Sequence, residues 1–241
     1  MKKLSIVIPA YNEEKYIAKL LERVLSVPTE TLGFSKEVIL VDDGSKDATF
    51  REASRFQDVR TFQQVPNQGK GRAVQRGIEE ATGDYVLVQD ADLEYDPNDY
   101  LTMLRSLDFK KKLAVYGSRT LGRYQKQKTF ILPGKHPEQG LGPYGAGVAL
   151  SSLTFMLYGN WLTDTLTAYK IYPMEFLRGL KVKTAGFETD HELTAKLLKQ
   201  GYEIREVPIQ YSPRSKEEGK KIKMSDGFTA VWTLLRFRFE D

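Results

Sequence analysis

Short apolar runs alternate along the first half of the chain with segments in which apolar residues recur every three or four positions. The runs at 4–9, 38–41, 59–65 and 86–88 predict strands, and the periodic segments after the first three predict helices. Strands that alternate with helices of this length indicate right-handed βαβ units. We therefore expect an α/β fold with a mostly parallel central sheet and helices on both of its faces.

Polar residues indicate where these helices begin. Asn12 is a good N-cap for the first helix, and Asp47 is placed to cap the second. The stretch 67–71 opens the third helix, which is expected to run to about Ala81.

The second half of the chain is less regular. We expect it to contain, in order, a helix at 97–107, a strand at 113–116, helices at 148–162 and 188–200, a strand at 203–210 and a helix at 226–239. The basic stretch 120–145 is rich in glycine and proline and shows no periodicity, which predicts a long loop acting as a lid or binding segment. The broadly apolar helix at 148–162 suits either the core or a bilayer surface.

Acidic residues follow the 86–88 strand directly. Asp90, Asp92 and Glu94 come at intervals of two, so in an extended chain all three side chains would point the same way. Carboxylate oxygens suit hard cations such as Mg²⁺ or Mn²⁺, which bind through one or two carboxylates together with substrate phosphates. The pattern predicts metal-assisted handling of a phosphorylated substrate, with a solvated acidic turn as the alternative.

The carboxyl ends of parallel strands meet at one edge of a sheet, where open α/β sheets place ligands. We expect this edge to collect Tyr11, Glu13, Asp43, Lys70, Asp90 and Asp92. A dinucleotide-binding domain is not indicated, because the 9–13 stretch lacks the glycine fingerprint that should follow the first strand. The Gly-Lys-Gly-Arg segment at 69–72 lacks the spacing of a phosphate-binding P-loop.

Composition narrows the chemistry further. The 241-residue chain contains no cysteine, which excludes disulfides, thiolate zinc sites and a cysteine nucleophile. Its two histidines, His136 and His191, form no recognisable metal pair. The chain does not begin with a signal-peptide pattern, and no run approaches the roughly 18 to 20 apolar residues that span a bilayer. We expect one domain over 1–241 and a cytosolic location.

Basic residues are unevenly distributed, although the net charge is only +4. Residues 109–137 hold eight Lys or Arg and no Asp or Glu, and residues 212–223 hold five basic residues against two acidic ones. Such runs suit a solvated face, an anionic membrane surface, a phosphate-bearing substrate or nucleic acid. No nucleic-acid-binding signature accompanies them, so we expect no nucleic-acid partner.

A set of motifs in a fixed order resembles the family 2 glycosyltransferases of GT-A fold, and within them the polyprenyl-phosphate hexosyl synthases typified by dolichol-phosphate mannose synthase. The matching stretches are Val-Ile-Pro-Ala-Tyr-Asn-Glu at 7–13, Val-Asp-Asp-Gly-Ser at 41–45, Asn-Gln-Gly-Lys-Gly at 67–71, Gln-Asp-Ala-Asp-Leu at 89–93, Gly-Ser-Arg at 117–119, Gly-Phe-Glu at 186–188 and Val-Pro-Ile at 207–209, followed by Arg214. The 120–160 region does not match the acceptor-loop sequence of the mannose synthases, and the transmembrane helices of many relatives are lacking. We therefore expect a soluble or peripheral catalytic module.

The resemblance implies a role for each matching position. Those implied to bind the nucleotide are Pro9, Tyr11, Glu13, Asp43, Lys70 and Gly71. Asp90 and Asp92 match the motif that holds metal and diphosphate, and Glu94 falls at a further metal contact. Arg119 and Arg214 match positions that hold the acceptor phosphate, which places them with Asp90 and Asp92 among the catalytic residues. The implied halves are a nucleotide-sugar part at 1–118 and an acceptor part at 119–241.

The resemblance implies an inverting hexosyltransferase that uses Mg²⁺ or Mn²⁺, takes GDP-mannose or UDP-glucose as donor and acts on a dolichyl or undecaprenyl phosphate at the cytoplasmic face of a membrane. One alternative is a family 2 enzyme acting on a sugar hydroxyl or small soluble acceptor, for which Asp190 is the candidate base; its other interpretation is a helix N-terminal charge. Another alternative is a non-catalytic nucleotide-sugar-binding module.

Overall fold

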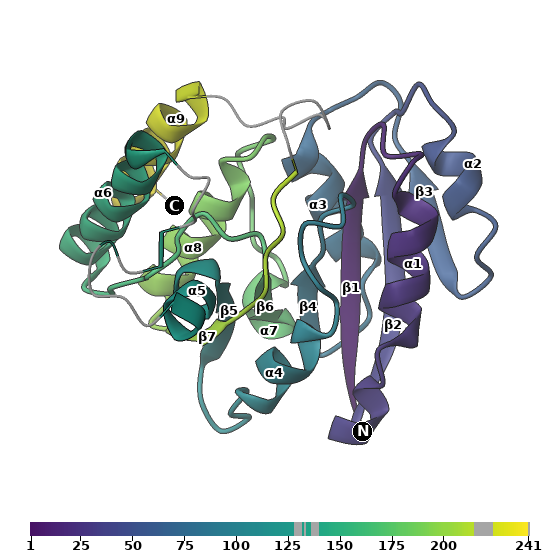
Figure 1. Ribbon diagram of the computed structural model, residues 1–241, viewed down its shortest axis with the longest axis horizontal. Helices are drawn as coiled ribbons and strands as arrows, with labels where there is room; N and C mark the ends of the chain where they lie inside the picture. The colour runs from purple at the N-terminus through teal and green to yellow at the C-terminus, as the bar shows by residue number, and fades with distance from the viewer. Residues whose placement is uncertain (128–131, 133, 136–139, 215–223, 241) are drawn as a thin grey trace.

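A seven-stranded sheet forms the centre of the protein in the order β3-β2-β1-β4-β6-β5-β7 (Figure 1). The structure is a computed structural model that describes residues 1–127, 132, 134–135, 140–214 and 224–240. Its strands are β1 (Lys2–Ala10), β2 (Phe34–Asp42), β3 (Val59–Gln63), β4 (Tyr85–Val88), β5 (Leu113–Ser118), β6 (Lys170–Pro173) and β7 (Glu203–Pro208). Among the pairs described, β6 is antiparallel to β4 and β5, and the others are parallel. The predicted mostly parallel α/β fold is confirmed.

Helices cover both faces of this sheet. They are α1 (Ile17–Ser26), α2 (Thr49–Ala53), α3 (Lys70–Glu80), α4 (Asp99–Arg105), α5 (Arg119–Gln127), α6 (Leu141–Tyr158), α7 (Met174–Leu177), α8 (Thr189–Lys199) and α9 (Met224–Phe239), with a 3-10 helix at Thr29–Leu32. One apolar core joins α1, α2 and α4 to the sheet, and others join α3, α7 and α8 to the opposite face. The alternation of inward-facing apolar residues along β1 explains this: Leu4, Ile6 and Ile8 enter one core, while Val7 enters another.

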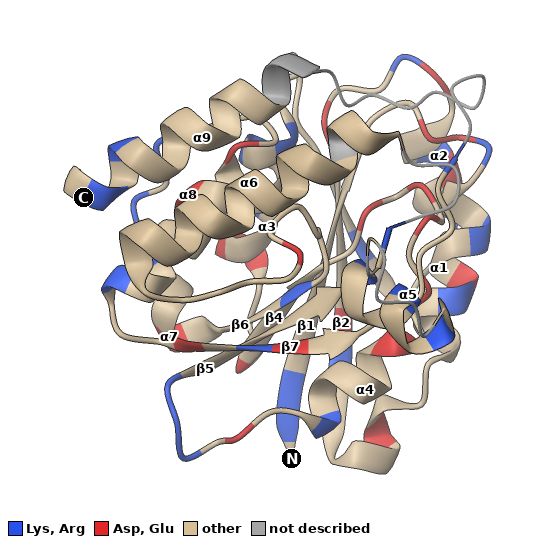
Figure 2. Ribbon diagram, turned by 60° about the vertical axis from the view of Figure 1, so that its left-hand side comes forward, with Lys and Arg blue, Asp and Glu red and all other residues tan. Residues whose placement is uncertain are grey.

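Helices α6 and α9 form an outer pair. They lie side by side and pack on α8 through a small core that includes Leu150, Ala195 and Leu234 (Figure 2). None of the described helices is both long and apolar enough to cross a bilayer.

Two local predictions were wrong. Asn12 does not cap α1; it adopts a left-handed conformation (φ 54°), and its side-chain oxygen accepts the backbone N–H of Lys46 at 2.9 Å. The stretch 120–145 is not one irregular loop, because it contains α5 and the start of α6, although 128–131, 133 and 136–139 lie outside the described residues. Helix α5 buries no side chain fully, and Leu121 and Tyr124 are its only large apolar residues, so its sequence carried little apolar signal. It instead packs its backbone on β7, where a Cβ on Gly122 would lie 2.1 Å from the Ile209 carbonyl oxygen.

Asp47 meets the capping prediction at α2 only in part, because it precedes the cap position by one residue. Its carboxylate accepts the backbone N–H of Thr49, the first residue of the helix, at 2.9 Å, although the cap position itself is Ala48. The first turn of this short helix is thereby supplied with an acceptor.

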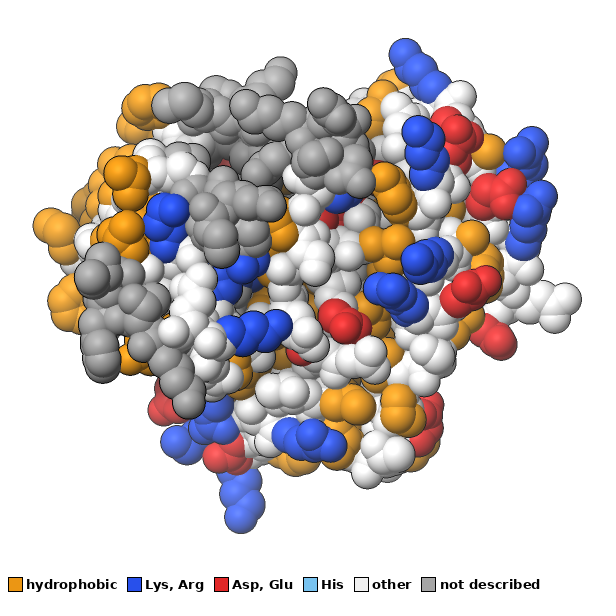
Figure 3. All heavy atoms as spheres, in the orientation of Figure 1, with side chains coloured by type: hydrophobic (Ala, Val, Ile, Leu, Met, Phe, Trp, Pro, Cys, Tyr) orange, Lys and Arg blue, Asp and Glu red, His pale blue; other side chains and the backbone are white. Residues whose placement is uncertain are grey.

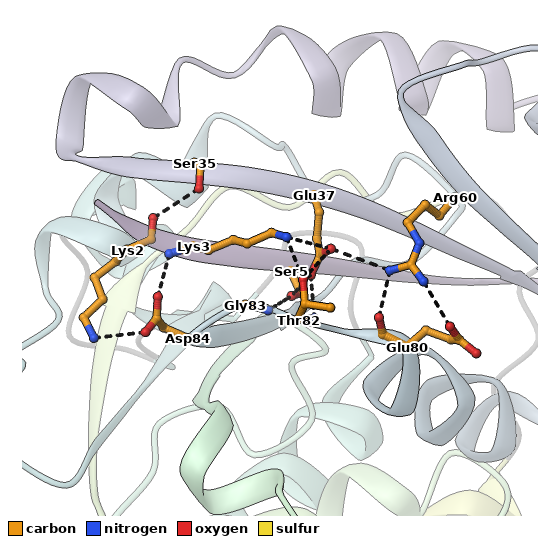
Figure 4. Close-up of polar contacts among 10 residues, drawn as sticks. All are labelled: Lys2, Lys3, Ser5, Ser35, Glu37, Arg60, Glu80, Thr82, Gly83 and Asp84. Atoms are coloured by element: carbon orange, nitrogen blue, oxygen red, sulfur yellow. Dashed lines mark hydrogen bonds and ion pairs between the residues drawn. The ribbon is translucent and has the colours of Figure 1, made fainter.

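A polar network joins the sheet at the edge opposite the strands' carboxyl ends (Figure 4). Glu37 on β2 accepts hydrogen bonds from the Ser5 hydroxyl at 2.5 Å and from the Thr82 backbone N–H at 2.7 Å. Its carboxylate also pairs with Lys3 at 3.1 Å and Arg60 at 3.7 Å. Burial alone would raise the pKa of Glu37, but the hydrogen bonds outweigh burial and hold the pKa below its usual value. This network ties β1 and β2 to the turn before β4.

Candidate active site at the carboxyl edge of the sheet

The acidic segment after β4 is a turn rather than an extended chain. The backbone bends at 91–93, and Leu93 adopts a positive φ of 60°. Because side chains alternate regularly only in an extended strand, the expectation that Asp90, Asp92 and Glu94 point the same way does not hold. Asp90 instead faces Lys70, whereas Asp92 and Glu94 face Arg214.

Lys70 and Asp90 form an ion pair across the β4 edge. The Lys70 ammonium lies 2.6 Å from the Asp90 carboxylate and 5.5 Å from the centre of the Phe187 ring. Burial would lower the pKa of Lys70, but the Asp90 carboxylate outweighs it and raises the pKa. Lys70 is therefore a fixed positive charge at the N-terminus of α3.

Arg214 joins the first and fourth strand ends. Its guanidinium lies 3.0 Å from Glu13 and 3.1 Å from Asp92, and its Nε is 3.6 Å from Glu94. Its backbone N–H donates to Glu94 at 2.9 Å. The structure thus brings together Glu13, Asp92, Glu94 and Arg214, as expected for one site, but in direct contact with one another.

The acidic cluster remains short of positive charge despite Arg214. Burial, followed by the neighbouring carboxylates of Asp90 and Glu94, raises the pKa of Asp92 to about 7. Oxygen-only donors of this kind fit Mg²⁺ or Mn²⁺, which bind through one or two carboxylates and substrate phosphates. In the described parts of the chain, however, no group of three or more acidic, histidine or cysteine side chains is placed to hold a metal ion. The predicted set of three carboxylate ligands is therefore corrected to the pair Asp90 and Asp92, which would need further ligands from the substrate.

The residues expected at the nucleotide end surround the ends of β1 and β2. Pro9 is buried in β1, and Tyr11 is half-buried just beyond it. The Asp43 carboxylate accepts backbone N–H groups of Gln68 and Gly69, each at 2.8 Å, and the side-chain amide of Gln64 at 2.6 Å. Asp43 therefore holds the 64–69 loop against β2 in this arrangement.

Gly71 is required by close packing. A Cβ there would lie 2.0 Å from the Thr189 hydroxyl and 2.7 Å from the Ala185 carbonyl carbon. The glycine lets α3 approach the 184–189 segment, so Lys70 lies near the N-terminus of α8.

Arg119 is engaged by a carboxylate that sequence reasoning missed. Asp164 accepts the Arg119 Nε and Nη2 hydrogen bonds, both at 2.7 Å, and the Arg119 backbone N–H at 3.0 Å. The guanidinium also lies 5.0 Å from the centre of the Tyr211 ring. Asp164 lies in an aperiodic stretch, so no sequence pattern indicated its role.

A second missed residue, Lys170, lies beneath Asp190. Its ammonium is fully buried, 3.3 Å from the Asp190 carbonyl oxygen and 4.0 Å from the Asp190 carboxylate. Burial lowers the pKa of Lys170, and burial together with Lys170 lowers the pKa of the neighbouring His191 to about 3. His191 is therefore neutral in the folded protein at ordinary pH, and His136 lies outside the described residues.

Several tyrosines pack against the acidic turn or form hydrogen bonds with residues next to it. Tyr95 stacks on Tyr169 with ring centres 4.5 Å apart, and both Tyr100 and Tyr169 donate to the buried Gln89 side chain. The Tyr211 hydroxyl donates to Glu94. These contacts fix the turn that carries Asp90 and Asp92.

Comparison with known proteins identifies the family. A model of glycosyl transferase family 2 matches residues 5–161. A dolichyl-phosphate beta-glucosyltransferase of Trichomonas vaginalis is 27% identical over 97% of this chain and 72% of its own length. A dolichol-phosphate mannosyltransferase of Pyrococcus furiosus is 27% identical over 90% of this chain and 59% of its own length.

Solved structures share the fold. The glucosyl-3-phosphoglycerate synthase of Mycobacterium tuberculosis, in complex with Mn²⁺, UDP and phosphoglyceric acid, superposes with a TM-score of 0.68 at 20% identity, over 99% of this chain and 79% of that one. The family match covers more than half of the sequence and includes the acidic turn and Arg119. The chain belongs to glycosyl transferase family 2.

Proposed function

We propose that this transferase moves a hexose from a nucleotide sugar, UDP-glucose or GDP-mannose, to a polyprenyl phosphate such as dolichyl or undecaprenyl phosphate, with inversion at the anomeric carbon. The observation that carries the proposal is the acidic turn of Asp90 and Asp92, with Arg214 directly on it. Relatives named for transfer to dolichyl phosphate match nearly the whole chain, and they include both a glucosyltransferase and a mannosyltransferase.

The donor is proposed to bind across the ends of β1, β2 and β4. Pro9, Tyr11, Glu13 and Asp43 would hold the nucleoside, with Asp43 acting partly through the 64–69 loop that it fixes. Lys70 and Gly71 lie at the N-terminus of α3, where a positive side chain and backbone N–H groups favour an anionic diphosphate.

Asp90 and Asp92 are proposed to hold Mg²⁺ or Mn²⁺, with Glu94 supporting Asp92 from the same turn. A bound divalent cation would stabilise the negative charge that develops on the leaving diphosphate. A further cation would favour the ionised form of Asp92, since burial and the neighbouring carboxylates raise its pKa to about 7 even with Arg214 beside it.

A phosphate acceptor is already anionic, so it needs placement rather than deprotonation. One of its oxygens would attack the anomeric carbon as the bond to the nucleoside diphosphate breaks, and no proton has to be removed. Guanidinium groups match phosphate geometry. We assign this placement to Arg119, which Asp164 holds in a fixed orientation, and to Arg214.

An exposed apolar surface on the outer helices suits a lipid acceptor. Large hydrophobic side chains are exposed on the outer helix pair, and we call them the α6/α9 face: Leu141, Val148, Phe155 and Met156 of α6, Trp161 after it, and Phe228, Trp232 and Phe239 of α9. Figure 3 has the orientation of Figure 1, and it shows hydrophobic side chains gathered on the side where Figure 1 labels α6 and α9. Helix α6 contains no Asp, Glu, Lys or Arg over 18 residues. We propose that this face contacts the membrane peripherally, which favours the surface interpretation of the predicted 148–162 helix.

The basic segments contribute to the same proposal only in part. Of the basic segments 109–137 and 212–223, the structure describes 109–127, 132, 134–135 and 212–214. Much of the 128–137 stretch and all of 215–223 lie outside the described residues. We propose one catalytic domain in which 1–118 serves the donor and 119–241 serves the acceptor.

A hydroxyl acceptor is the second candidate function. Asp190 has a partly exposed carboxylate at the N-terminus of α8, close to the charges of Lys70 and Lys170. An alcohol would need such a base to remove its proton. This position keeps the alternative open for a sugar or a small soluble acceptor.

A panel of two donors and two acceptors decides between these functions. UDP-glucose and GDP-mannose would each be incubated with Mn²⁺ and either a short polyprenyl phosphate or the matching polyprenol, and the sugar-lipid product measured. We expect transfer from one donor to the phosphate and none to the alcohol. Transfer to the alcohol that Asp190→Asn abolishes would establish the hydroxyl mechanism instead.

A further inference from the structure

Arg214 occupies the space between two groups of carboxylates. Its Nη1 lies 3.0 Å from Glu13 at the end of β1, and its Nη2 lies 3.1 Å from Asp92 in the turn after β4. The ring of Tyr16 lies 5.4 Å from the guanidinium carbon. The arginine side chain is only 11% exposed, so one positive charge is held among three carboxylates out of contact with most solvent.

The fit of Arg214 in this place is incomplete. Its Nε is buried and has no hydrogen-bond partner, although it lies 3.6 Å from Glu94. A buried donor without an acceptor is unfavourable, so the ionic contacts with Glu13 and Asp92 must hold the guanidinium there. Moving a guanidinium that has one unsatisfied donor out of its place costs less free energy than moving one whose donors are all paired.

The carboxylates that hold Arg214 are those proposed to serve the donor, with Glu13 at the nucleoside and Asp92 at the metal. A divalent cation binds carboxylate oxygens at about 2.0 to 2.2 Å, where it would face the guanidinium across the same oxygen atoms. Two cations so close repel each other, so binding of a divalent cation by Asp92 weakens the contact that Arg214 makes with the same carboxylate.

We propose that Arg214 is an internal counter-ion that holds the donor carboxylates before the substrate binds, and that the metal and nucleotide displace it. The released guanidinium then becomes available to the acceptor phosphate. This inference rests on the proposed function and adds an order to it: the donor binds first, and the phosphate acceptor binds tightly only afterwards.

Metal binding without any nucleotide tests the competition. The affinity for Mn²⁺ alone would be measured by calorimetry for the unchanged protein, Arg214→Gln and Arg214→Lys. We expect Arg214→Gln to bind Mn²⁺ at least tenfold more tightly, and Arg214→Lys to stay within about threefold of the unchanged protein because it retains the charge. Unchanged or weaker binding by Arg214→Gln, or no Mn²⁺ binding by any of the three, would overturn the proposal.

Arg123→Gln is the matched control. Arg123 donates to the Tyr211 carbonyl oxygen at 3.1 Å, so its loss removes a nearby positive charge without removing a contact to the three carboxylates. We expect it to change Mn²⁺ affinity by less than threefold. A gain as large as that of Arg214→Gln would mean that general charge, and not displacement of Arg214, controls metal binding.

Acceptor binding tests the order. The affinity for a short polyprenyl phosphate would be measured with and without UDP or GDP and Mn²⁺. We expect the nucleotide to tighten it at least fivefold in the unchanged protein and to leave it unaltered in Arg214→Gln. Equal acceptor affinity with and without nucleotide, in a protein that still transfers sugar to the phosphate, overturns the inference and leaves the proposed function standing. Absence of transfer to any polyprenyl phosphate instead removes the proposed function.

Discussion

Asp92 is the residue on which the proposed chemistry depends most directly. Replacing it by Ala should remove a metal ligand and lower turnover with Mg²⁺ or Mn²⁺ by ~100-fold or more. This loss of turnover is larger than the loss typically seen for residues that only form a hydrogen bond to a metal ligand. Stability should change little, because Asp92 lies at the edge of the sheet and its charge is already disfavoured there. Turnover and urea unfolding would be compared with those of Glu79→Ala, an exposed acid on α3. Full turnover of Asp92→Ala, or undiminished turnover in excess EDTA, would exclude the metal-assisted mechanism.

Asp43 gives a separate prediction about the nucleotide. Because its carboxylate holds the 64–69 loop through three hydrogen bonds, Asp43→Ala should release that loop. Loss of one to three kcal/mol of such contacts corresponds to roughly five- to 150-fold weaker binding of UDP or GDP. Calorimetry without sugar or acceptor measures this, and Glu13→Gln tests the other strand end. Unchanged nucleotide affinity in both variants would mean that the early motifs are structural turns.

The sequence placed the main site residues at one edge but did not give their pairing. Strand ends and their order follow from apolar runs, so the proximity of Glu13, Lys70, Asp90 and Asp92 was predictable. The bend at 91–93 depends on packing of Tyr95 against Tyr169, and the Arg119 partner Asp164 lies 45 residues away. Local patterns carry no information on contacts over such separations.

Helices and strands that pack an apolar face on the core could be predicted from the sequence. Elements that are positioned by backbone contacts or by a buried charged residue could not. Strands β1 to β5 and β7 and helices α1, α3, α4, α8 and α9 lie near their expected positions. Strand β6 was missed because it has only four residues and begins with Lys170, which is buried although charged. Helix α5 was missed because its contact with β7 runs through Gly122.

We expect the Glu37 network to stabilise the amino-terminal edge of the sheet. Glu37→Gln removes the charge while keeping the shape, and it leaves Lys3 without its carboxylate, whereas Arg60 keeps its ion pair with Glu80 at 3.0 Å (Figure 4). The free energy of unfolding should fall by about 1 to 3 kcal/mol, and nucleotide affinity should not change because the site is at the other edge. Urea unfolding of Glu37→Gln and of the exposed control Glu22→Gln gives the difference. Equal stability of the two variants would show that the network contributes nothing net.

His191 predicts a pH dependence at the start of α8. Burial and the Lys170 charge lower its pKa to about 3, whereas an unfolded histidine titrates near 6.5. Between these values the unfolded chain binds the extra proton, so stability falls as pH decreases below about 6.5, by about 1.4 kcal/mol per pH unit for this one group.

His191→Gln should remove that contribution. The loss of unfolding free energy between pH 7 and pH 5 should be smaller in the variant by about 2 kcal/mol, because one titrating group no longer contributes. Urea unfolding at both pH values measures the difference, and other titrating groups cancel in the comparison. The same loss in both proteins would show that His191 is accessible to protons in the folded state.

At the scale of the whole molecule, the outer helix pair exposes large apolar side chains, and its charges include Arg236 and Arg238 in the last turn of α9. The overall α/β architecture followed from the alternation of strands and helices. The α6/α9 face did not, because the sequence predicted a helix at 226–239 without indicating which of its apolar side chains stay exposed. Helix α9 packs beside α6, and Phe228 and Trp232 of α9 are exposed, as are Phe155 and Met156 of α6. Which side chains of the two helices stay exposed can be recognised only from the packing of both helices on α8.

Membrane attachment through this face is the last prediction. Phe228 and Trp232 are 78% and 65% exposed, so replacing both by Ser should not reduce stability. Each large apolar side chain that enters the acyl region contributes about 1.5 to 3 kcal/mol, so the double variant should bind anionic vesicles at least ~100-fold more weakly. Arg236 and Arg238 on the same helix should make binding weaker at high salt and on neutral lipid.

Cosedimentation at low and high salt measures both effects, with Phe109→Ser, an exposed aromatic in the loop before β5, as the matched control. Equal vesicle binding by the double variant and the control would show that α6 and α9 do not contact lipid. The exposed aromatic residues would then need another partner, and the case for a lipid acceptor would rest on the arginines alone.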